Sequence, residues 1–270
     1  MFTFFLSGSG GWDVNSLSYS SKSYDVSEDN ALRSVFFKSD GLKMYVLGDT
    51  NDTVYQYSLS TAWSVNTASY DTKSKSVSSE ETQSYGLTFK NDGTAMYIVG
   101  NANKTVYQYT LSTPWDVGTA SYASKSKLVS TEEANPAYIF FKYDGTSMYI
   151  TGPGSDKTYQ YTLSSAWDVS TASYASKASD LSGSGDTLMV GGFFDTSGVK
   201  LFAVGQGTTD SVYEYVLGTP WDASTSSYTS KSFSVASQDS APWNIFFRQD
   251  GRKMYLAGAT SQKIFEYDLI

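Results

Sequence analysis

Short apolar runs separated by Gly, Asp, Asn and Ser follow one another along the whole chain. Within a run the apolar and polar positions alternate. In VYQYTL, residues 106–111, the side chains of Tyr107, Tyr109 and Leu111 share one face of an extended strand. No segment places its apolar residues at helical spacing. The pattern therefore predicts β-strands along the chain and no α-helix.

The runs belong to a unit that occurs five times, with three markers recurring every 51 to 54 residues. The first marker is a loop with the sequence GWDV, AWSV, PWDV, AWDV or PWDA, here called the Trp loop, at Trp12, Trp63, Trp115, Trp167 and Trp221. The second is a tight turn ending in Gly41, Gly93, Gly145, Gly198 and Gly251. The third is a run of the VYQY type that begins at Val54, Val106, Thr158, Val212 and Ile264. We therefore treat residues 1–270 as one domain with repeats at about 12–62, 63–114, 115–166, 167–220 and 221–270.

Each unit contains four predicted strands. A run such as VFFK is followed by an Asp-Gly turn, which is typical of a tight hairpin because glycine accepts positive φ. A run such as MYVLG, the VYQY run and a more polar strand after the Trp loop complete the unit. Four antiparallel strands repeated five times predict an all-β fold, a five-bladed β-propeller.

The two ends of the chain predict how the ring closes. The chain starts with a strand of the fourth type, residues 19–26, and ends with one of the third type, residues 264–269. We therefore expect the N-terminal strand to complete the last blade. Residues 2–6 (FTFFL) form a surplus apolar run with no assigned place.

The fourth strand carries one lysine in every copy, and we expect these side chains to protect an exposed outer edge from pairing with other chains. A ring of lysines that binds a ligand is the alternative. The five residues are Lys22, Lys73, Lys125, Lys177 and Lys231.

Composition and charge exclude several function classes. The formal net charge is −8, from 27 acidic and 19 basic residues, which argues against a nucleic-acid partner and against binding to anionic lipid. The chain has no Cys and no His, so it lacks a thiolate, the commonest general base and the commonest zinc ligand. No apolar stretch reaches the roughly 20 residues that span a bilayer, and we recognise no signal peptide. We expect no cofactor and no membrane insertion.

One acidic residue recurs twelve residues before each turn glycine. Recurrence in every copy favours a scaffold role, with each acid accepting backbone N–H groups in a loop. A ring of acids that binds a cation near the axis is a second hypothesis. Catalytic acids of a glycoside hydrolase are a third, although catalysis needs acids that differ in pKa and role. The five acids are Asp29, Glu81, Glu133, Asp186 and Asp239.

The loops fall into two groups. Alternating strand direction places the turns and the Trp loops on one face, where the copies are nearly uniform. The other two connections lie on the opposite face and differ from copy to copy (DTND, NANK, PGSD, QGTTD, ATSQ). A uniform scaffold with varied loops on one face is typical of recognition. On that face Trp243, Tyr138, Tyr85 and Arg33 directly precede the inner strands, and we expect the aromatic rings to stack on a sugar or to anchor a protein. The alternative is that the rings plug the channel.

The segment LSTPWDVGTASYASKSKLVSTEEANPAYIFFKYDGTSMYITG, residues 111–152, resembles a repeat of predicted proteins from bacteriophages and environmental bacteria. The resemblance covers nearly the whole chain, from Trp12 to Leu269. Copy four departs from the pattern, because it reads GGFFDTSGVKLFAVG and lacks the Asp-Gly turn. Proteins of this kind look like virion or surface components, often within tail-associated or fibre-like proteins.

The resemblance and the loop contrast together predict a non-enzymatic recognition module located on a phage virion or a cell surface. Its expected partner is a host glycan, a host surface protein or a neighbouring virion protein. Three alternatives stay open: a secreted multivalent lectin with one site per blade, a structural decoration or spacer without a ligand, and a glycoside hydrolase.

Overall fold

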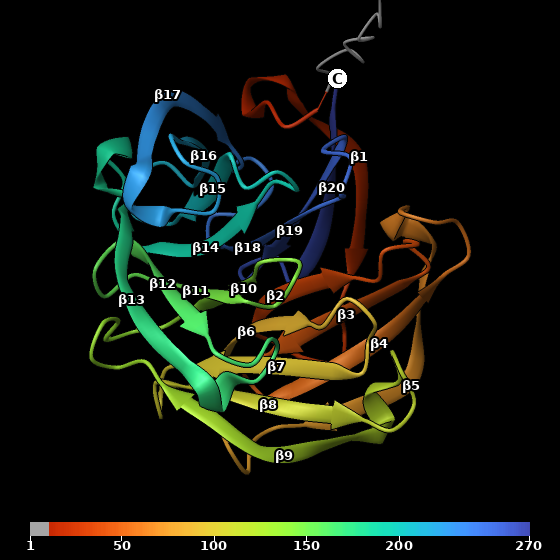
Figure 1. The fold of residues 1–270 in the computed structure, drawn as a ribbon. Helices are drawn as coiled ribbons and strands as arrows, with labels where there is room; N and C mark the ends of the chain where they lie inside the picture. Colours follow the sequence, from red (N-terminus) through yellow and green to blue (C-terminus); the bar gives the residue numbers. More distant parts are fainter. Residues whose placement is uncertain (1–10) are drawn as a thin grey trace, which may run out of the picture.

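The computed structural model describes residues 11–270, and Figure 1 displays them as a ring of five sheets. Each sheet has four antiparallel strands, which confirms the five-bladed β-propeller. The described residues contain no α-helix. Their helical segments are six 3-10 turns of three residues each. One of them is Ser182–Ser184. The other five begin directly after the residue that follows a repeating Trp: Val14–Ser16, Val65–Thr67, Val117–Thr119, Val169–Thr171 and Ala223–Thr225. The surplus run at residues 2–6 lies outside the described residues.

The strands of each blade run from the axis to the rim in chain order. Blade 1 comprises β2 (Leu32–Phe37), β3 (Lys43–Gly48), β4 (Thr53–Leu59) and β5 (Ala68–Ser76). Blade 2 comprises β6 (Ser84–Phe89), β7 (Ala95–Gly100), β8 (Thr105–Leu111) and β9 (Ala120–Leu128). Blade 3 comprises β10 (Tyr138–Phe141), β11 (Ser147–Gly152), β12 (Lys157–Leu163) and β13 (Ala172–Asp180). Blade 4 comprises β14 (Met189–Phe194), β15 (Lys200–Gly205), β16 (Ser211–Leu217) and β17 (Ser226–Ser234).

Blade 5 is built from both ends of the chain. Its first three strands are β18 (Pro242–Phe247), β19 (Lys253–Gly258) and β20 (Lys263–Leu269), and its outer strand is β1 (Leu17–Asp25). β1 pairs with β20 in antiparallel register, Leu17 opposite Leu269, and the C-terminus lies close to β1 in Figure 1. The predicted closure is therefore confirmed. The Trp loop of blade 5 is likewise supplied by the N-terminal segment, because Trp12 donates its backbone N–H to Gly251 O at 3.0 Å.

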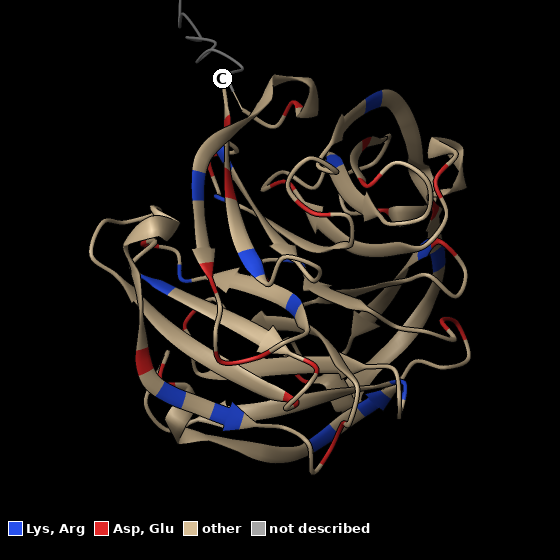
Figure 2. Ribbon diagram, turned by 180° about the vertical axis from the view of Figure 1, so that it is seen from behind, with Lys and Arg blue, Asp and Glu red and all other residues tan. Residues whose placement is uncertain are grey.

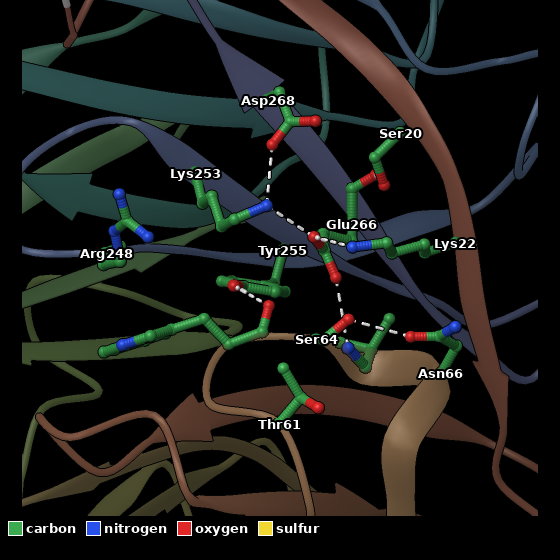
Figure 3. A network of polar contacts seen from close by, with 12 residues as sticks. Ser20, Lys22, Thr61, Ser64, Asn66, Arg248, Lys253, Tyr255, Glu266 and Asp268 are labelled. Carbon is green, nitrogen blue, oxygen red and sulfur yellow. Dashed lines mark hydrogen bonds and ion pairs between the residues drawn. The ribbon is translucent and has the colours of Figure 1, made fainter.

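A buried ionic network joins the closing strand to its neighbours (Figure 3). Glu266 on β20 is fully buried and pairs with Lys22 on β1 at 3.4 Å and with Lys253 on β19 at 2.5 Å. It also accepts the backbone N–H of Val65 in blade 1 at 3.1 Å. Burial alone lowers the pKa of Lys253, but hydrogen bonds to Asp268 and Glu266 outweigh it and raise that pKa above its ordinary value. One carboxylate thus links three strands of blade 5 to the next blade.

Each Trp loop covers the turn of its own blade and packs against the preceding blade. Gly93 has φ of +74°, and a Cβ there would lie 2.4 Å from the indole of Trp115. That indole stacks on Phe89 of its own blade and on Phe36 of blade 1, with ring centroids 5.7 and 6.3 Å apart. All five copies have the glycine under the indole, including the Ser-Gly turn of copy four: Gly41 with Trp63, Gly93 with Trp115, Gly145 with Trp167, Gly198 with Trp221, and Gly251 with Trp12.

The third strand of each blade binds the next blade through one side chain. A Gln amide oxygen or a Glu carboxylate oxygen accepts the N–H of the first residue in the 3-10 turn of the next blade, and these five bonds measure 3.0 to 3.3 Å. The acceptors are Gln56, Gln108, Gln160, Glu214 and Glu266, and the donors are Val117, Val169, Ala223, Val14 and Val65 respectively. The central polar residue of the VYQY marker is therefore an inter-blade contact.

The lysines of the outer strands also link blades. Lys73, Lys125 and Lys177 each pair with the aspartate of the next Trp loop, for example Lys125 with Asp168 at 2.6 Å. Lys231 pairs with Asp13 in the same way at 3.1 Å. Most acidic residues, red in Figure 2, lie in loops and turns. The sequence predicted edge protection for these lysines and did not foresee the pairing.

The tight turns make stability sensitive to acid. The side chains of Asp92 and Asp144 are about half exposed. The limited desolvation of their carboxyl groups opposes ionisation, but hydrogen bonds from Lys90 and Thr94 and from Lys142 and Thr146 outweigh it and lower each pKa to about 2 from 3.8. Such a group stabilises the fold above its ordinary pKa, and this contribution is lost as the pH falls through the folded value. We expect the urea midpoint to fall between about pH 4 and pH 2. The double variant D92N/D144N should show a smaller fall than the parent, and an equal fall would contradict the assignment.

Candidate functional site

The ring has two chemically different ends. The turn end carries the tight turns and the Trp loops, which contact each other as in the Trp63 N–H to Gly41 O bond of 2.9 Å. The loop end carries the connection from each outer strand to the next blade and the connection from second to third strand. These two connections also meet, because Asp29 in the first accepts N–H groups of Thr50 and Asn51 in the second. The loops therefore gather on the faces that the sequence predicts.

The recurrent acids hold the loops of the loop end together. Asp29 accepts the backbone N–H of Ala31 at 2.9 Å, of Thr50 at 3.2 Å and of Asn51 at 3.0 Å. Glu81 accepts those of Gln83, Ala102 and Asn103 at 3.0 to 3.1 Å. All five acids, Asp29, Glu81, Glu133, Asp186 and Asp239, are at most 3% exposed. This geometry matches the scaffold hypothesis.

The other two hypotheses for these acids find no support in their positions. Among residues 11–270, no three or more Asp or Glu side chains come together as a metal site, and each acid instead faces its own loop. Burial raises the pKa of Glu81 and of Glu133 although both accept backbone N–H groups. The two acids therefore have the same role in successive blades, whereas a hydrolase needs two carboxyl groups with different roles.

A glycine makes room for each of these acids. A Cβ on Gly48 at the end of β3 would lie 2.1 Å from Cγ of Asp29, and one on Gly258 would lie 2.4 Å from Oδ2 of Asp239. The sequence carries this signal, because the second strand ends in Gly in every copy, nineteen residues after the acid. The pairing of acid and glycine is the reason for that glycine, and sequence analysis alone missed it.

Three of the four predicted recognition residues come together at the loop end. The guanidinium carbon of Arg33 lies 4.1 Å from the ring centroid of Trp243 and 5.2 Å from that of Tyr85. The rings of Tyr85 and Trp243 meet edge to face, 5.1 Å apart. Asp49 holds the other side of the guanidinium, with 2.8 Å between Nη2 and Oδ2. The cluster comes from blades 1, 2 and 5, which are consecutive in the ring.

Tyr138 does not belong to this surface. It is only 6% exposed, and burial raises the pKa of its hydroxyl well above the ordinary value. The positions of blades 3 and 4 that correspond to Arg33 are Ala137 and Val190, each 1% exposed. The loop end is therefore asymmetric, with large side chains on one side of the axis and small buried ones on the other.

The cluster is polar at its centre but poor in free charge. Arg33 and Asp49 are each 17% exposed in their side chains and neutralise one another. Burial raises the pKa of Asp49 even though Arg33 acts to lower it. The indole Nε1 of Trp243 is buried and has no hydrogen-bond partner within residues 11–270. The arrangement presents the partly exposed rings of Tyr85 and Trp243 beside a guanidinium that Asp49 already holds.

The turn end, which sequence analysis treated as uniform, contains the apolar cavity of the ring. Its lining includes Phe36, Thr88, Phe140 and the indole of Trp115. The only signal in the sequence is Thr88, which stands where the other copies have Phe.

None of the helical segments in residues 11–270 has the length and apolar character to cross a membrane. No protein family model matches the chain, and no curated protein sequence matches it.

Similarity to solved structures is confined to the fold. A functionally unknown protein from Desulfotomaculum acetoxidans aligns with a TM-score of 0.51 at 12% identity, over 84% of this chain and 62% of the other. A Bacteroides uniformis protein, provisionally named as a 6-phosphogluconolactonase, aligns with a TM-score of 0.51 at 12% identity, over 87% and 65%. The chain thus spans less than two thirds of either protein. The β-propeller domain of Cps50 (Swd1) from Myceliophteria thermophila aligns with a TM-score of 0.50 at 8% identity, over 92% of this chain and all of the domain. At these identities the chain is a β-propeller whose function its neighbours do not assign.

Proposed function

We propose that this protein is a non-enzymatic recognition module that binds its partner at the loop end. The partner is a glycan or protein of a host surface, and the setting is a phage virion or a bacterial surface. The resemblance of the repeat to phage and environmental proteins supports the setting. The loop contrast and the cluster of Arg33, Tyr85 and Trp243 support the site.

The observation that carries the proposal is the position of Arg33 between Trp243 and Asp49. An arginine stacked on an aromatic face and held by a carboxylate keeps its orientation at little entropic cost. Trp and Tyr add contact area with few rotatable bonds. A preorganised aromatic and guanidinium patch surrounded by varied loops suits a sugar ring or a protein side chain.

Binding is favoured over catalysis because the carboxylate of the cluster and the recurrent acids beside it already have partners. Asp49 is paired with Arg33, and Asp29 and Glu81 accept backbone N–H groups. A hydrolase needs a free acid and a second carboxylate about 5–10 Å away across the substrate. A phosphate-bearing sugar lactone would need an unpaired cation, and the one cation of the cluster is neutralised.

The asymmetry of the loop end also separates this proposal from a lectin with one site per blade. Arg33, Tyr85 and Trp243 correspond to Ala137 and Val190 in the other two blades, so the cluster exists once per ring. We expect one binding site per chain by calorimetry. Five equivalent sites would support the lectin and contradict the single cluster.

The test of the site is the variant W243A. On an array of bacterial surface glycans, we expect the parent to bind one or a few structures and W243A to bind them at least about tenfold more weakly, since an interface aromatic contributes about 2 kcal/mol or more. The matched control is Q249A, an exposed residue of the turn end, which should bind like the parent. Equal binding by W243A and the parent would overturn the site.

If the parent binds no glycan, the protein form of the proposal is tested with purified outer-surface proteins of the host and the same two variants. Loss of binding in W243A alone supports the site. Absence of binding to both partner classes supports the structural spacer instead.

A further inference from the structure

Four phenylalanines form an incomplete aromatic circle around the axis near the turn end. Phe36 meets Phe246, Phe246 meets Phe193, and Phe193 meets Phe140, with centroids 5.2 to 5.4 Å apart and an interplanar angle of 69° in each pair. These residues occupy the same position of the inner strand in blades 1, 5, 4 and 3. Edge-to-face contact at this spacing is favourable because the positive ring edge meets the negative ring face.

Blade 2 interrupts the circle. Its residue at this position is Thr88, which lies between the blades of Phe36 and Phe140. Phe36 and Phe140 therefore lack the neighbour that completes the circle, and Phe36 is more exposed than the other three rings. A cavity of about 60 Å³ lies on the axis at the turn end and includes this gap. Its wall contains Phe36, Thr88, Phe140, Phe193 and Phe246 and the indoles of Trp63, Trp115 and Trp167.

The lining of the cavity contains no charged residue. Its apolar wall is topped by exposed neutral polar residues, Ser39, Asn91 and Gln249. Tyr143 forms part of the wall, edge-on to Phe140 and Trp221. Its hydroxyl is buried and has no hydrogen-bond partner within residues 11–270, which is destabilising.

The geometry points to a second binding site, at the turn end, for a small neutral aromatic molecule that carries one hydroxyl group. The aryl ring takes the place of the missing fifth phenylalanine and makes edge-to-face contacts with Phe36 and Phe140. The hydroxyl group of the ligand lies near the side chain of Thr88, which lines the cavity. This site is separate from the loop-end cluster and independent of the partner proposed there.

Size and charge define the ligand class. The space measures about 60 Å³ and lies where the other blades place a phenyl ring, so it admits at most a single ring and excludes a fused polycyclic ring. The absence of charge in the lining disfavours carboxylates, because an unpaired anion against an apolar wall loses its hydration without compensation. Aliphatic rings of the same size lose the edge-to-face contacts, which are worth about 0.5–1.5 kcal/mol for each aromatic pair.

The experiment is a titration of the full chain with 4-fluorophenol, followed by fluorine NMR. We expect saturable binding by the parent and binding at least about tenfold weaker by T88F, whose own ring completes the circle and fills the cavity. T88A keeps the cavity open and should bind more tightly than T88F, although it loses the contact between the ligand and the Thr88 hydroxyl group. W243A, at the other end, should bind like the parent.

The folded state of each variant is checked by its thermal midpoint. T88F is expected to keep the parent midpoint or exceed it, because it copies the residue of the other blades. If T88F melts at least about 3 °C below the parent, as a loss of about 1 kcal/mol would produce in a chain of this size, the site is decided by the binding of T88A and by the affinities of the parent for the ligand series.

Two results would overturn the site. One is undiminished binding of 4-fluorophenol by a folded T88F, which would place the ligand elsewhere. The other is a ligand series without the expected selectivity. Equal affinity for cyclohexanol and 4-fluorophenol would contradict aromatic recognition, and equal affinity for benzoate and 4-fluorophenol would contradict a preference for neutral ligands. These outcomes do not depend on the loop-end site: they would hold even if W243A bound the loop-end partner as tightly as the parent does.

Discussion

Removal of residues 1–25 is expected to abolish the cooperative thermal transition of the protein. The truncated chain lacks Trp12, which covers Gly251, and the buried residues Val14 and Leu17. It also exposes the whole edge of β20, which β1 covers by pairing from Leu17 to Asp25. The losses exceed the roughly 5–15 kcal/mol by which a typical domain is stable. Circular dichroism and size-exclusion chromatography should reveal an unfolded or aggregated chain.

A circular permutant shows whether instability comes from the loss of β1 or only from a new position of the chain ends. In the other blades three residues join the third strand to the Trp loop, as Leu111 is followed by Ser-Thr-Pro and Trp115. A chain that starts at Glu28, passes from Ile270 through an added Thr-Pro to Trp12 and ends at Ser27 reproduces that spacing. We expect this permutant to melt near the parent. A truncated chain that melts as a monomer at the parent temperature would contradict the closing role of β1.

Substitution of a turn glycine is expected to have the largest effect of any single residue. In G93V the new Cβ would lie 2.4 Å from the indole of Trp115, at a backbone φ of +74°. Backbone strain of about 1–3 kcal/mol adds to displacement of an indole whose removal typically costs about 3–5 kcal/mol. We therefore expect a free energy of unfolding lower by about 4 kcal/mol or more in urea titration.

The matched control for this prediction is G185V. Gly185 has nearly the same backbone conformation, with φ of +78°, but no heavy atom lies within 4 Å of the position of its Cβ. The control measures backbone strain alone, and the difference between the two variants measures the indole contact. An equal decrease in the free energy of unfolding in G93V and G185V would show that displacement of the Trp115 indole does not destabilise the fold.

Our proposals place a different binding site at each end of the ring. At the loop end the recurrent acids hold the loops, so the loops can vary while the backbone keeps its shape. At the turn end the glycines and indoles repeat without change, and the exception is a single inner-strand residue, Thr88. Both proposed sites thus arise at positions where the blades differ from one another.

The blade count, the strand order and the closure could be predicted from the sequence because they depend on local signals. Alternation with a period of two identifies each strand, and the turn glycines mark where the chain reverses. Antiparallel order then assigns each loop to one face. The scaffold role of Asp29 and its equivalents was among the predicted alternatives, since a residue that recurs in every copy serves what every copy shares.

The side chains that meet between blades could not be predicted in the same way. Arg33, Tyr85 and Trp243 are separated by 52 or more residues, and their contact depends on how closely the closed ring brings the inner strands together. Burial also depends on contacts between blades, which no local pattern reveals, and Tyr138, predicted as a surface residue, is buried for this reason. The same dependence explains why the pairing of Lys125 with Asp168 was not foreseen.

The sequence by itself determined the architecture of this protein, five four-stranded blades in which the first strand completes the last sheet, because each of its signals acts within one hairpin. The tertiary structure alone decided which departures from the repeat matter, because an Arg, a Trp or a Thr acquires its role from neighbours that only ring closure supplies.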